Sequence, residues 1–399
     1  MKQKNKIPKK WKKEILKDIA IVFDGQHTTP KYVDYGIPFY SVENIVSGEP
    51  VKYISKEEYK INTKRNKPLK GDILISRIGT LCKNIIATWE GNYAIYVTLA
   101  LIRSKVRDVS NKFLHQFFQT HMYNKDFFSK SLLIAYPQKI NMEDLEKTSV
   151  LIPPIKEQEK IVEILELWDK AIETTKKLIE QKKLQKKYLM QKLLTGKIRL
   201  KGFKDRWKKY KLGDVCDFIS GFSFSSNDFC DRGILLIKIS NISNGKIVLS
   251  DEDVYLPIDY VYKYKQFVIK QNDLLIAMSG ATTGKLAINT SNKQLLLNQR
   301  VGIIRTLKFN QNFINQYLFA FKNKFLKMSY GGAQPNISSE DIKKIIIYIP
   351  QNLTEQKAIA DILSTADNQI NLLEQKLSKL ELQKKGLMQK LLTGQIRVC

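Results

Sequence analysis

The segments "YLMQKLLTGKIR" (Tyr188–Arg199) and "GLMQKLLTGQIR" (Gly386–Arg397) are nearly the same phrase, written once at the middle of the chain and once near its end. Between Leu189–Arg199 and Leu387–Arg397, ten of eleven residues are identical, at an offset of 198 in a chain of 399. A near-identical phrase at half the chain length indicates that a larger unit is present twice.

The repeat extends well beyond this phrase. "WKKEILKDIA" from Trp11 matches "WKKYKLGDVC" from Trp207, and "GDILISRIGT" from Gly71 matches "NDLLIAMSGA" from Asn272. "PQKINMEDL" likewise matches "QPNISSEDI", and "LIPPIKEQ" matches "YIPQNLTEQ". The offsets lie between 196 and 201, far beyond the ~20–50 residues of solenoid repeats. We interpret the chain as two collinear copies of a domain followed by a helix, and therefore as a pseudo-two-fold molecule.

The composition favours a polyanionic partner. Lys and Arg number 67 against 39 Asp and Glu, a formal charge of +28 that attracts DNA, RNA or an anionic membrane. A lysine-rich genome is the alternative explanation. The four cysteines form no CxxC pair, which fits a reduced cytoplasmic compartment. No apolar run approaches the ~18–20 residues of a membrane span, and the basic N-terminus lacks the apolar stretch of a signal peptide.

Each repeated phrase ends a long amphipathic helix. In the second copy apolar residues recur with 4-3 spacing, the pattern of a coiled-coil seam, over about five heptads with one polar break at Lys384. In the first copy the equivalent positions are apolar at both ends and mostly polar in the middle, at Thr175, Lys182 and Lys186. Each helix is about 40 residues, roughly 60 Å long, and Gly196 and Gly394 stand where a helix C′ glycine is favoured. The nearest matching stripe is the other copy, so we expect an antiparallel two-helix coiled coil; packing of each helix on its own domain is the alternative. The predicted apolar seam residues are Ile161, Leu165, Trp168, Ile172, Leu189, Leu193, Ile359, Leu363, Ile370, Leu373, Leu377, Leu380, Leu387 and Leu391.

The remaining sequence indicates mixed α/β domains, with strand-like runs such as "GDILISRIG" and "NDLLIAMSG" preceding helical stretches in each copy. The predicted fold class is therefore α/β (α+β) domains in tandem, joined by two long helices that form an antiparallel coiled coil. The expected organisation is domain 1 over residues 1–150, helical region 1 over 151–198, domain 2 over 199–350 and helical region 2 over 351–399.

With the repeat, "QPNIS", the "IPPxxEQ" helix entry and the "LMQKLLTG" helix exit in hand, the chain resembles the DNA-specificity (S) subunits of type I restriction-modification systems. The resemblance covers essentially the whole chain. "DGQHTTPKYVDYGIPFYSVENI" in the first copy is close to the family's Gly-x-Thr-Pro opening, whereas "SGFSFSSNDF" in the second copy departs from it. This difference fits two domains that read different half-sites.

The resemblance implies a non-catalytic, cytoplasmic bacterial or archaeal subunit whose two target recognition domains each read one half of a bipartite DNA site. It implies a coiled coil that sets the spacer and docks two adenine-N6 methyltransferase (M) subunits, with motor-nuclease (R) subunits in the full complex. No cofactor is implied for this chain; S-adenosylmethionine is expected in the partner methyltransferase. A coiled-coil assembly scaffold without sequence selectivity is the alternative function.

The sequence offers no catalytic constellation. "SGATTGKL" (Ser279–Leu286) is one residue short of a phosphate-binding loop and has Leu286 where Ser or Thr would bind magnesium. No (N/D)PP(Y/F) methylase motif and no PD…(D/E)xK nuclease cluster occurs. His115 and His121 are six residues apart on an expected helix, so their rings would not share a face and a metal site is not predicted.

DNA contacts require Lys or Arg for phosphates and Arg, Lys, Asn or Gln forks for base edges. An ordinary turn or capping role is the alternative for each candidate. The candidates in domain 1 are Gln26, His27, Thr28, Thr29, Lys31, Tyr32, Arg77, Lys83, Tyr136, Gln138 and Lys139. Those in domain 2 are Ser223, Ser225, Ser226, Lys238, Asn241, Lys285, Asn298, Gln299, Arg300, Gln334 and Asn336. The segment Lys176–Lys192, with seven lysines, is either a basic surface for DNA or methylase or a solvated helix flank.

Overall fold

The computed structural model describes residues 7–48, 51–64, 66–243, 245–280, 282–328 and 336–398. The chain forms two compact units: unit 1 comprises Met1–Lys176 and Gln375–Cys399, and unit 2 comprises Lys177–Glu374. Each unit therefore contains one globular domain together with part of both long helices.

In unit 1 a central sheet has the strand order β2-β9-β6-β7, and a second sheet has the order β3-β5-β4-β8. β1 and β10 form a separate antiparallel pair. The strand bounds are β1 Lys12–Ile15, β2 Ala20–Asp24, β3 Tyr32–Val33, β4 Ile37–Tyr40, β5 Lys52–Ile54, β6 Ile73–Ser76, β7 Asn84–Ile86, β8 Ala94–Ile95, β9 Leu99–Ser104 and β10 Ser149–Ile152. The helices are α1 Leu16–Ile19, α2 Val42–Val46, α3 Lys56–Asn62, α4 Asn111–Phe117, α5 His121–Ser129 and α6 Met142–Glu146.

The central sheet of unit 1 is buried on both faces. Successive strand residues point to opposite sides of a sheet, and here they enter two different cores. Ile73 and Ile75 of β6 belong to the core that contains the helical residues Phe113 and Phe117. Leu74, between them, belongs to a different core with Tyr40 and Tyr93. This explains why the strand reads as an apolar run rather than as an apolar-polar alternation.

Unit 2 repeats this plan. Its central sheet has the order β12-β21-β18-β19-β15-β14, a second sheet has the order β16-β13-β20-β17, and β11 pairs with β22. The strand bounds are β11 Lys208–Lys211, β12 Cys216–Ser220, β13 Ile234–Ile237, β14 Ile242–Ser243, β15 Gly245–Ile247, β16 Val254–Leu256, β17 Val268–Ile269, β18 Leu274–Ala277, β19 Leu286–Ile288, β20 Leu295–Leu297, β21 Val301–Thr306 and β22 Ile346–Ile349. The helices are α8 Tyr260–Lys263, α9 Gln311–Ala320, α10 Asn323–Met328 and α11 Ser339–Lys343.

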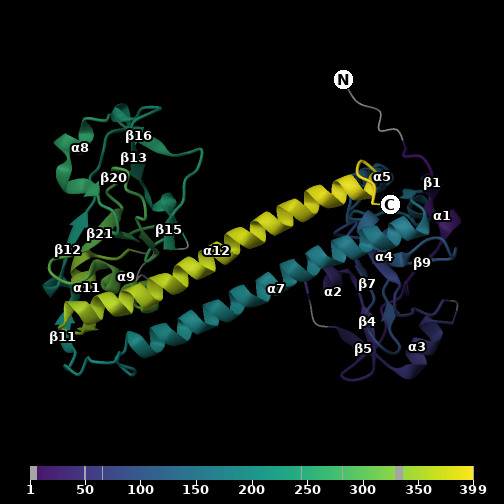
Figure 1. The fold of residues 1–399 in the computed structure, drawn as a ribbon, viewed down its shortest axis with the longest axis horizontal. Helices are drawn as coiled ribbons and strands as arrows, with labels where there is room; N and C mark the ends of the chain where they lie inside the picture. The colour runs from purple at the N-terminus through teal and green to yellow at the C-terminus, as the bar shows by residue number, and fades with distance from the viewer. Residues whose placement is uncertain are drawn as a thin grey trace. The chain divides into compact units, whose positions relative to one another are not determined.

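The two long helices are α7, Ile155–Leu193, and α12, Leu353–Leu392, and they lie side by side within each unit (Figure 1). In unit 1 the beginning of α7 shares a core with the end of α12, represented by Leu165 and Leu391. In unit 2 the end of α7 shares a core with the beginning of α12, represented by Leu193 and Leu363. The helices are therefore antiparallel, and the predicted fold class is confirmed.

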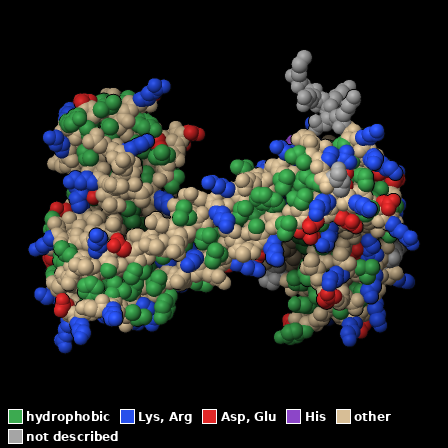
Figure 2. Space-filling view, in the orientation of Figure 1, with side chains coloured by type: hydrophobic (Ala, Val, Ile, Leu, Met, Phe, Trp, Pro, Cys, Tyr) green, Lys and Arg blue, Asp and Glu red, His purple; other side chains and the backbone are tan. Residues whose placement is uncertain are grey.

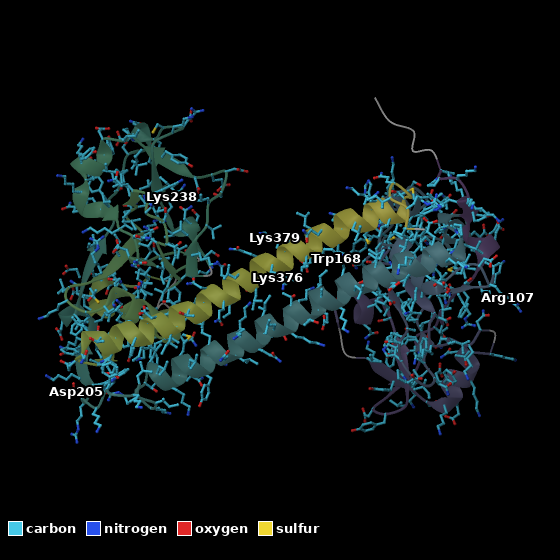
Figure 3. All side chains as sticks on the ribbon, in the orientation of Figure 1. Arg107, Trp168, Asp205, Lys238, Lys376 and Lys379 are labelled. Carbon is cyan, nitrogen blue, oxygen red and sulfur yellow. The ribbon has the colours of Figure 1, made fainter. Side chains whose placement is uncertain are left out.

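Burial along α7 and α12 follows the predicted 4-3 spacing. Ile161, Leu165, Leu193, Ile359 and Leu391 are buried near the helix ends. The other predicted seam residues are buried or half-buried, including Trp168, which projects from α7 (Figure 3). Gly196 and Gly394 follow the helix ends with φ of 66° and 71°, as expected of C′ glycines.

Candidate DNA interface

Three loops leave unit 1 at one edge of its central sheet. The first loop (residues 25–31) follows β2, the second loop (77–83) follows β6, and the third loop (131–139) follows α5. β2 ends where Asp24 pairs with Ala100, and β6 ends where Ser76 pairs with Leu99. β2 and β6 therefore end opposite neighbouring residues of β9, so the first and second loops begin side by side at the same end of the sheet.

The first and second loops are held by a partly buried ion pair. Arg77 Nη1 donates to Asp24 Oδ2 at 3.3 Å and to the Val97 carbonyl oxygen at 2.9 Å. The exposed His27 ring lies beside the same carboxylate, with Nε2 3.0 Å from Asp24 Oδ2. Burial lowers the pKa of Arg77, while the Asp24 charge opposes that shift. Arg77 therefore positions the loops from beneath rather than presenting its guanidinium to solvent.

The third loop is bonded directly to the second. Gly79 N donates to the Gln138 carbonyl oxygen at 2.8 Å, and Ile140 N donates to the Arg77 carbonyl oxygen at 2.9 Å. All three loops thus form one connected surface of unit 1.

Unit 2 has the same backbone framework. Phe222 N donates to the Leu297 carbonyl oxygen at 3.1 Å, just as Gln26 N donates to Ile95 at 3.0 Å. Ile337 N donates to the Met278 carbonyl oxygen at 2.9 Å, as Ile140 N donates to the Arg77 carbonyl oxygen in unit 1, and Met278 N donates to the Arg300 carbonyl oxygen at 2.9 Å. The backbone hydrogen bonds that hold the loops of unit 1 therefore recur in unit 2.

The close approach of the first loop to the sheet also recurs. A Cβ on Gly25 would lie 2.0 Å from the Ile95 carbonyl oxygen, and a Cβ on Gly221 would lie 2.0 Å from the Asn298 carbonyl oxygen. Only glycine permits this approach in either unit. The side chains differ, however, because Ser220 and Met278 occupy the positions of Asp24 and Arg77.

Most of the candidate contact residues are exposed. The exposed ones are His27, Thr28, Thr29, Lys31, Tyr32, Lys83, Tyr136, Gln138, Lys139, Ser223, Ser225, Ser226, Lys285, Gln299, Arg300 and Asn336. Gln26, Lys238 (labelled in Figure 3) and Asn298 are half-buried, whereas Arg77 and Asn241 are buried. Gln334 lies outside the described residues.

Asn241 has internal partners on all sides. Its Nδ2 donates to the Val248 carbonyl oxygen at 3.0 Å and to Asp253 Oδ1 at 2.7 Å, and its Oδ1 accepts from Lys238 N at 2.9 Å. Its position suits organisation of the surrounding loop, which is the alternative role considered for it from the sequence.

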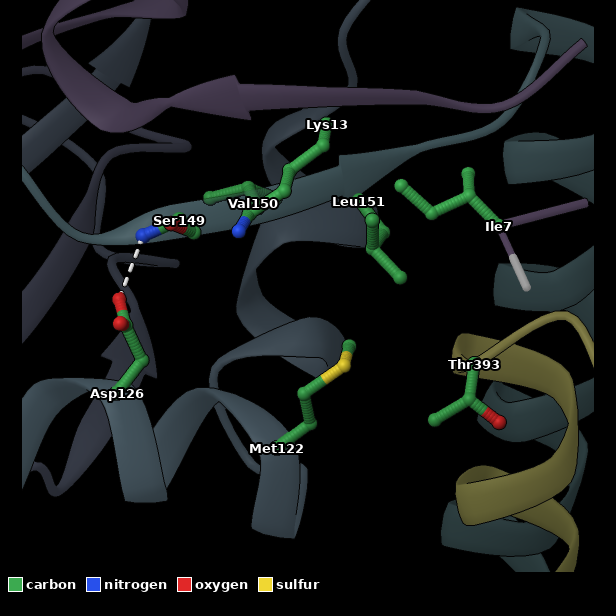
Figure 4. Close-up of a pocket in the computed structure, with 8 residues that line it drawn as sticks. All are labelled: Ile7, Lys13, Met122, Asp126, Ser149, Val150, Leu151 and Thr393. Carbon is green, nitrogen blue, oxygen red and sulfur yellow. Dashed lines mark hydrogen bonds between the residues drawn. The ribbon is translucent and has the colours of Figure 1, made fainter. Parts of the chain in front are cut away.

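Two buried cysteines and one half-buried histidine have pKa values shifted strongly toward the neutral form. The described residues hold no group of three or more His, Cys, Asp and Glu that could bind a metal. Burial raises the pKa of the Cys82 and Cys216 thiols to about 12 and lowers the pKa of His115 to about 4, so these groups are neutral at pH 7. A cavity of about 320 Å³ in unit 1, lined by Met122, Leu151 and other residues, holds Asp126, whose carboxylate already accepts from Ser149 N (Figure 4).

The surface charge suits a polyanion. Figure 2 shows Lys and Arg side chains spread over both units, with fewer Asp and Glu side chains on the same face. None of the helices in the described part of the chain carries an apolar stretch that would span a bilayer.

The ends of the long helices are locked by ion pairs, each of which joins the last residue of one repeated phrase to the start of the other long helix. Arg397, after α12, donates through Nε and Nη2 to the buried Glu157 carboxylate of α7 at 2.5 and 2.8 Å. In unit 2, Arg199 makes the same pair with Glu355 of α12, at 2.7 and 2.9 Å. The final "IR" of each phrase therefore fastens the end of one helix to the start of the other, a role that sequence reasoning missed.

The polar positions within the seam are also paired across the helices. Lys186 donates to Asp367 and Lys384 donates to Asp169, both at 2.5 Å. Domain side chains reach the same carboxylates, with Gln316 Nε2 2.9 Å from Asp367 and Gln116 Nε2 3.4 Å from Asp169. The lysine-rich segment thus contributes ties between helices as well as an exposed basic flank.

A further pair of contacts is asymmetric between the copies. Lys176 contacts Glu381 at 3.2 Å and Lys183 contacts Glu374 at 2.7 Å. These positions correspond in the repeat, so α7 carries lysine at both and α12 carries glutamate at both. Pairing α7 with α12 places lysine against glutamate and is attractive. Pairing α7 with a second α7 would place lysine against lysine and would be repulsive.

Reversing both charges on α7, as Lys176→Glu with Lys183→Glu, should lower the free energy of unfolding by about 1–2 kcal/mol, because two half-exposed ion pairs become like-charge contacts. Denaturant unfolding at low salt measures the change. Adding Glu374→Lys and Glu381→Lys should restore stability, and a quadruple variant no more stable than the double would refute the pairing.

Comparison with known proteins gives the family. The model for the type I restriction modification DNA specificity domain matches residues 8–183 and 204–382. The chain belongs to this family, whose members are the specificity subunits of type I restriction-modification systems. It is therefore a non-catalytic subunit without a cofactor of its own, and S-adenosylmethionine belongs to the partner methyltransferase.

Individual relatives cover the whole organisation. The chain is 30% identical over 378 residues to the type I restriction enzyme MjaVIII specificity subunit of Methanocaldococcus jannaschii, covering 90% of this chain and 86% of that one. It is 29% identical to the putative MjaX specificity subunit of the same organism, covering 98% and 95%. Relatives occur in bacteria as well, including the EcoBI subunit of Escherichia coli, at 25% identity over 44% of this chain and 35% of the relative.

Solved structures share the fold. The S subunit from M. genitalium superposes with a TM-score of 0.65 at 15% identity, covering 98% of both chains. A chain from work on complex assembly and conformational transition of the type I R-M system gives 0.60 at 17% identity, covering 98% of this chain and 100% of that one.

Proposed function

We propose that this specificity subunit reads a bipartite DNA site, with residues 1–150 reading one half and residues 199–350 reading the other. The observation that carries the proposal is the repeated loop framework with different side chains in the two units. The exposed His27 corresponds to Ser223, and Asp24 and Arg77 beneath it correspond to Ser220 and Met278. One framework with two sets of side chains suits two unlike half-sites.

We infer further that α7 and α12 fix the spacer and seat two identical methyltransferase subunits, with motor-nuclease subunits joining the full complex. Exposed apolar residues occur at equivalent places in the two copies: Leu184 and Leu382 on the helices, and Ile198 and Ile396 after them. Exposed apolar residues at equivalent positions support two equivalent binding surfaces for one kind of partner.

The phosphate contacts can be tested by salt dependence. The triple variant Lys31→Gln, Lys83→Gln, Lys139→Gln removes exposed charges from all three loops of unit 1. In the complex with the methyltransferase, the slope of log K against log salt should become shallower by about 3, at roughly 0.9 per lost phosphate contact. Fluorescence anisotropy with a duplex carrying the methylated site measures this slope.

A matched control is available at the opposite end of the same sheet, where Ala20 pairs with Ser104. Lys17, Lys105 and Arg107 are exposed there, and Arg107 is labelled in Figure 3. Their replacement by Gln should leave the slope unchanged. Equal effects of the two triple variants would indicate general charge attraction and would favour the scaffold function.

A further inference from the structure

The third loop of unit 1 exposes an apolar tip. Ile134 and Tyr136 have relative exposures of 102% and 104%, so both side chains are as open as in an extended peptide. Leu132 and Leu133, just before them, are also exposed. Four large apolar side chains in five residues form a patch of the kind that marks a binding surface.

Backbone hydrogen bonds join the two ends of the third loop below this tip. Leu132 N donates to the Lys139 carbonyl oxygen at 2.7 Å, and Lys139 N donates back to Leu132 at 3.4 Å. Ile78 of the second loop pairs with Lys139, and Gly79 N donates to the Gln138 carbonyl oxygen. These bonds hold the tip beside the second loop and therefore on the candidate DNA interface.

The neighbouring charges favour DNA as the occupant. Lys139 at the end of the third loop and Lys83 at the end of the second loop are both exposed, and Ile140 N, directly after the third loop, donates to the Arg77 carbonyl oxygen. A surface that offers both apolar and cationic side chains suits DNA, whose stacked bases are apolar and whose backbone is anionic. Ile and other apolar wedges are inserted between base steps by several DNA-bending proteins, and aromatic rings stack on bases.

We propose that Ile134 and Tyr136 form a wedge that inserts between base pairs of the half-site read by the first domain, unstacking one step and bending the duplex there. The proposal rests on the proposed function. It assigns the bend to one half of the site, because the second copy has Gly331 and Ala333 at the corresponding positions of its sequence.

The test uses the complex of the full chain with its methyltransferase and duplexes carrying 2-aminopurine at successive positions, excluding the adenine that is methylated. The complex with the parent chain should raise the 2-aminopurine fluorescence severalfold at one base step of the first half-site and at no step of the second half-site. The variant Ile134→Ser with Tyr136→Ser should abolish this rise, reduce the bend measured by energy transfer between the duplex ends, and weaken binding about tenfold. Both side chains are exposed, so the variant keeps its fold.

The control variant Ile61→Ser with Tyr262→Ser removes two side chains that are each 70% exposed elsewhere. It should retain the fluorescence rise. A double variant that keeps the rise, or one that loses assembly with the methyltransferase instead, would overturn the wedge and assign the tip to another role. Failure of the unmodified complex to select its site over scrambled DNA would instead refute the proposed function.

Discussion

Replacing Arg397 with methionine is expected to lower the free energy of unfolding by about 3 kcal/mol, because it leaves a buried carboxylate without its cation. Glu157 is buried and accepts two hydrogen bonds from Arg397 and one from Trp11 Nε1 at 3.1 Å. Arg397 also lies over the Trp11 ring, 5.7 Å from its centroid. Denaturant unfolding followed by circular dichroism measures the loss.

The pH dependence of this effect has a definite sign. Burial alone would raise the pKa of Glu157, but hydrogen bonds from Arg397 and Trp11 outweigh it and lower that pKa. A lowered folded-state pKa contributes stability above the unfolded pKa, and this contribution is lost as pH falls through the folded value. Without Arg397, burial should raise the pKa of Glu157. The difference in the free energy of unfolding between the parent and the Arg397→Met variant should therefore be largest at pH 7 and become smaller as the pH falls into the acid range.

Arg199→Met should show a loss of similar size, since Arg199 and Glu355 form the equivalent lock in unit 2. Arg107→Met, on the exposed surface, is the matched control and should change stability by less than about 0.5 kcal/mol. A loss below about 1 kcal/mol for Arg397→Met, or one independent of pH, would contradict the role given to the lock.

Exchanging residues 1–150 for those of a relative should replace one half of the methylated site and leave the other half unchanged. The three loops of unit 1 all lie within this segment, and the equivalent loops of unit 2 all lie outside it. The donor segment must keep a tryptophan at Trp11, because this residue donates to Glu157 beyond the exchange point. Sequencing that detects N6-methyladenine reports both halves.

The reciprocal exchange of residues 199–350 is the control and should alter only the other half. A change in both halves after either exchange would show that the domains do not read independently. Loss of all methylation with normal assembly would indicate damage to the loops and is resolved by exchanging the loops alone.

The long helices could be predicted because their signal is local and periodic. The 4-3 spacing predicts the buried positions of α7 and α12, and the glycines predict their ends. The locks could not be predicted in the same way. Arg397 and Glu157 are separated by 240 positions, and no periodicity connects them. The recurrence of "EQ" and "IR" in both copies was the available signal, and only the antiparallel packing shows that each pair joins different helices.

The candidate contacts were harder to predict because a polar loop residue can face inward or outward. Arg77 and Asn241 have the side chains that read DNA, yet both are buried against internal partners. Polar residues that precede a helix show the same ambiguity, because the Ser338 hydroxyl accepts from Asp341 N, whereas Asn141 Nδ2 donates to the Asp144 side chain. The exposed Ile134 escaped notice because apolar residues are expected inside.

The most direct test of the central claim is a genome-wide map of N6-methyladenine in a methylation-free host that expresses this chain with its methyltransferase, compared with a host expressing the methyltransferase alone. An asymmetric, bipartite motif that disappears when this chain is omitted is the predicted result. Methylation that persists at the same motif without this chain, or a continuous motif in its presence, would contradict it.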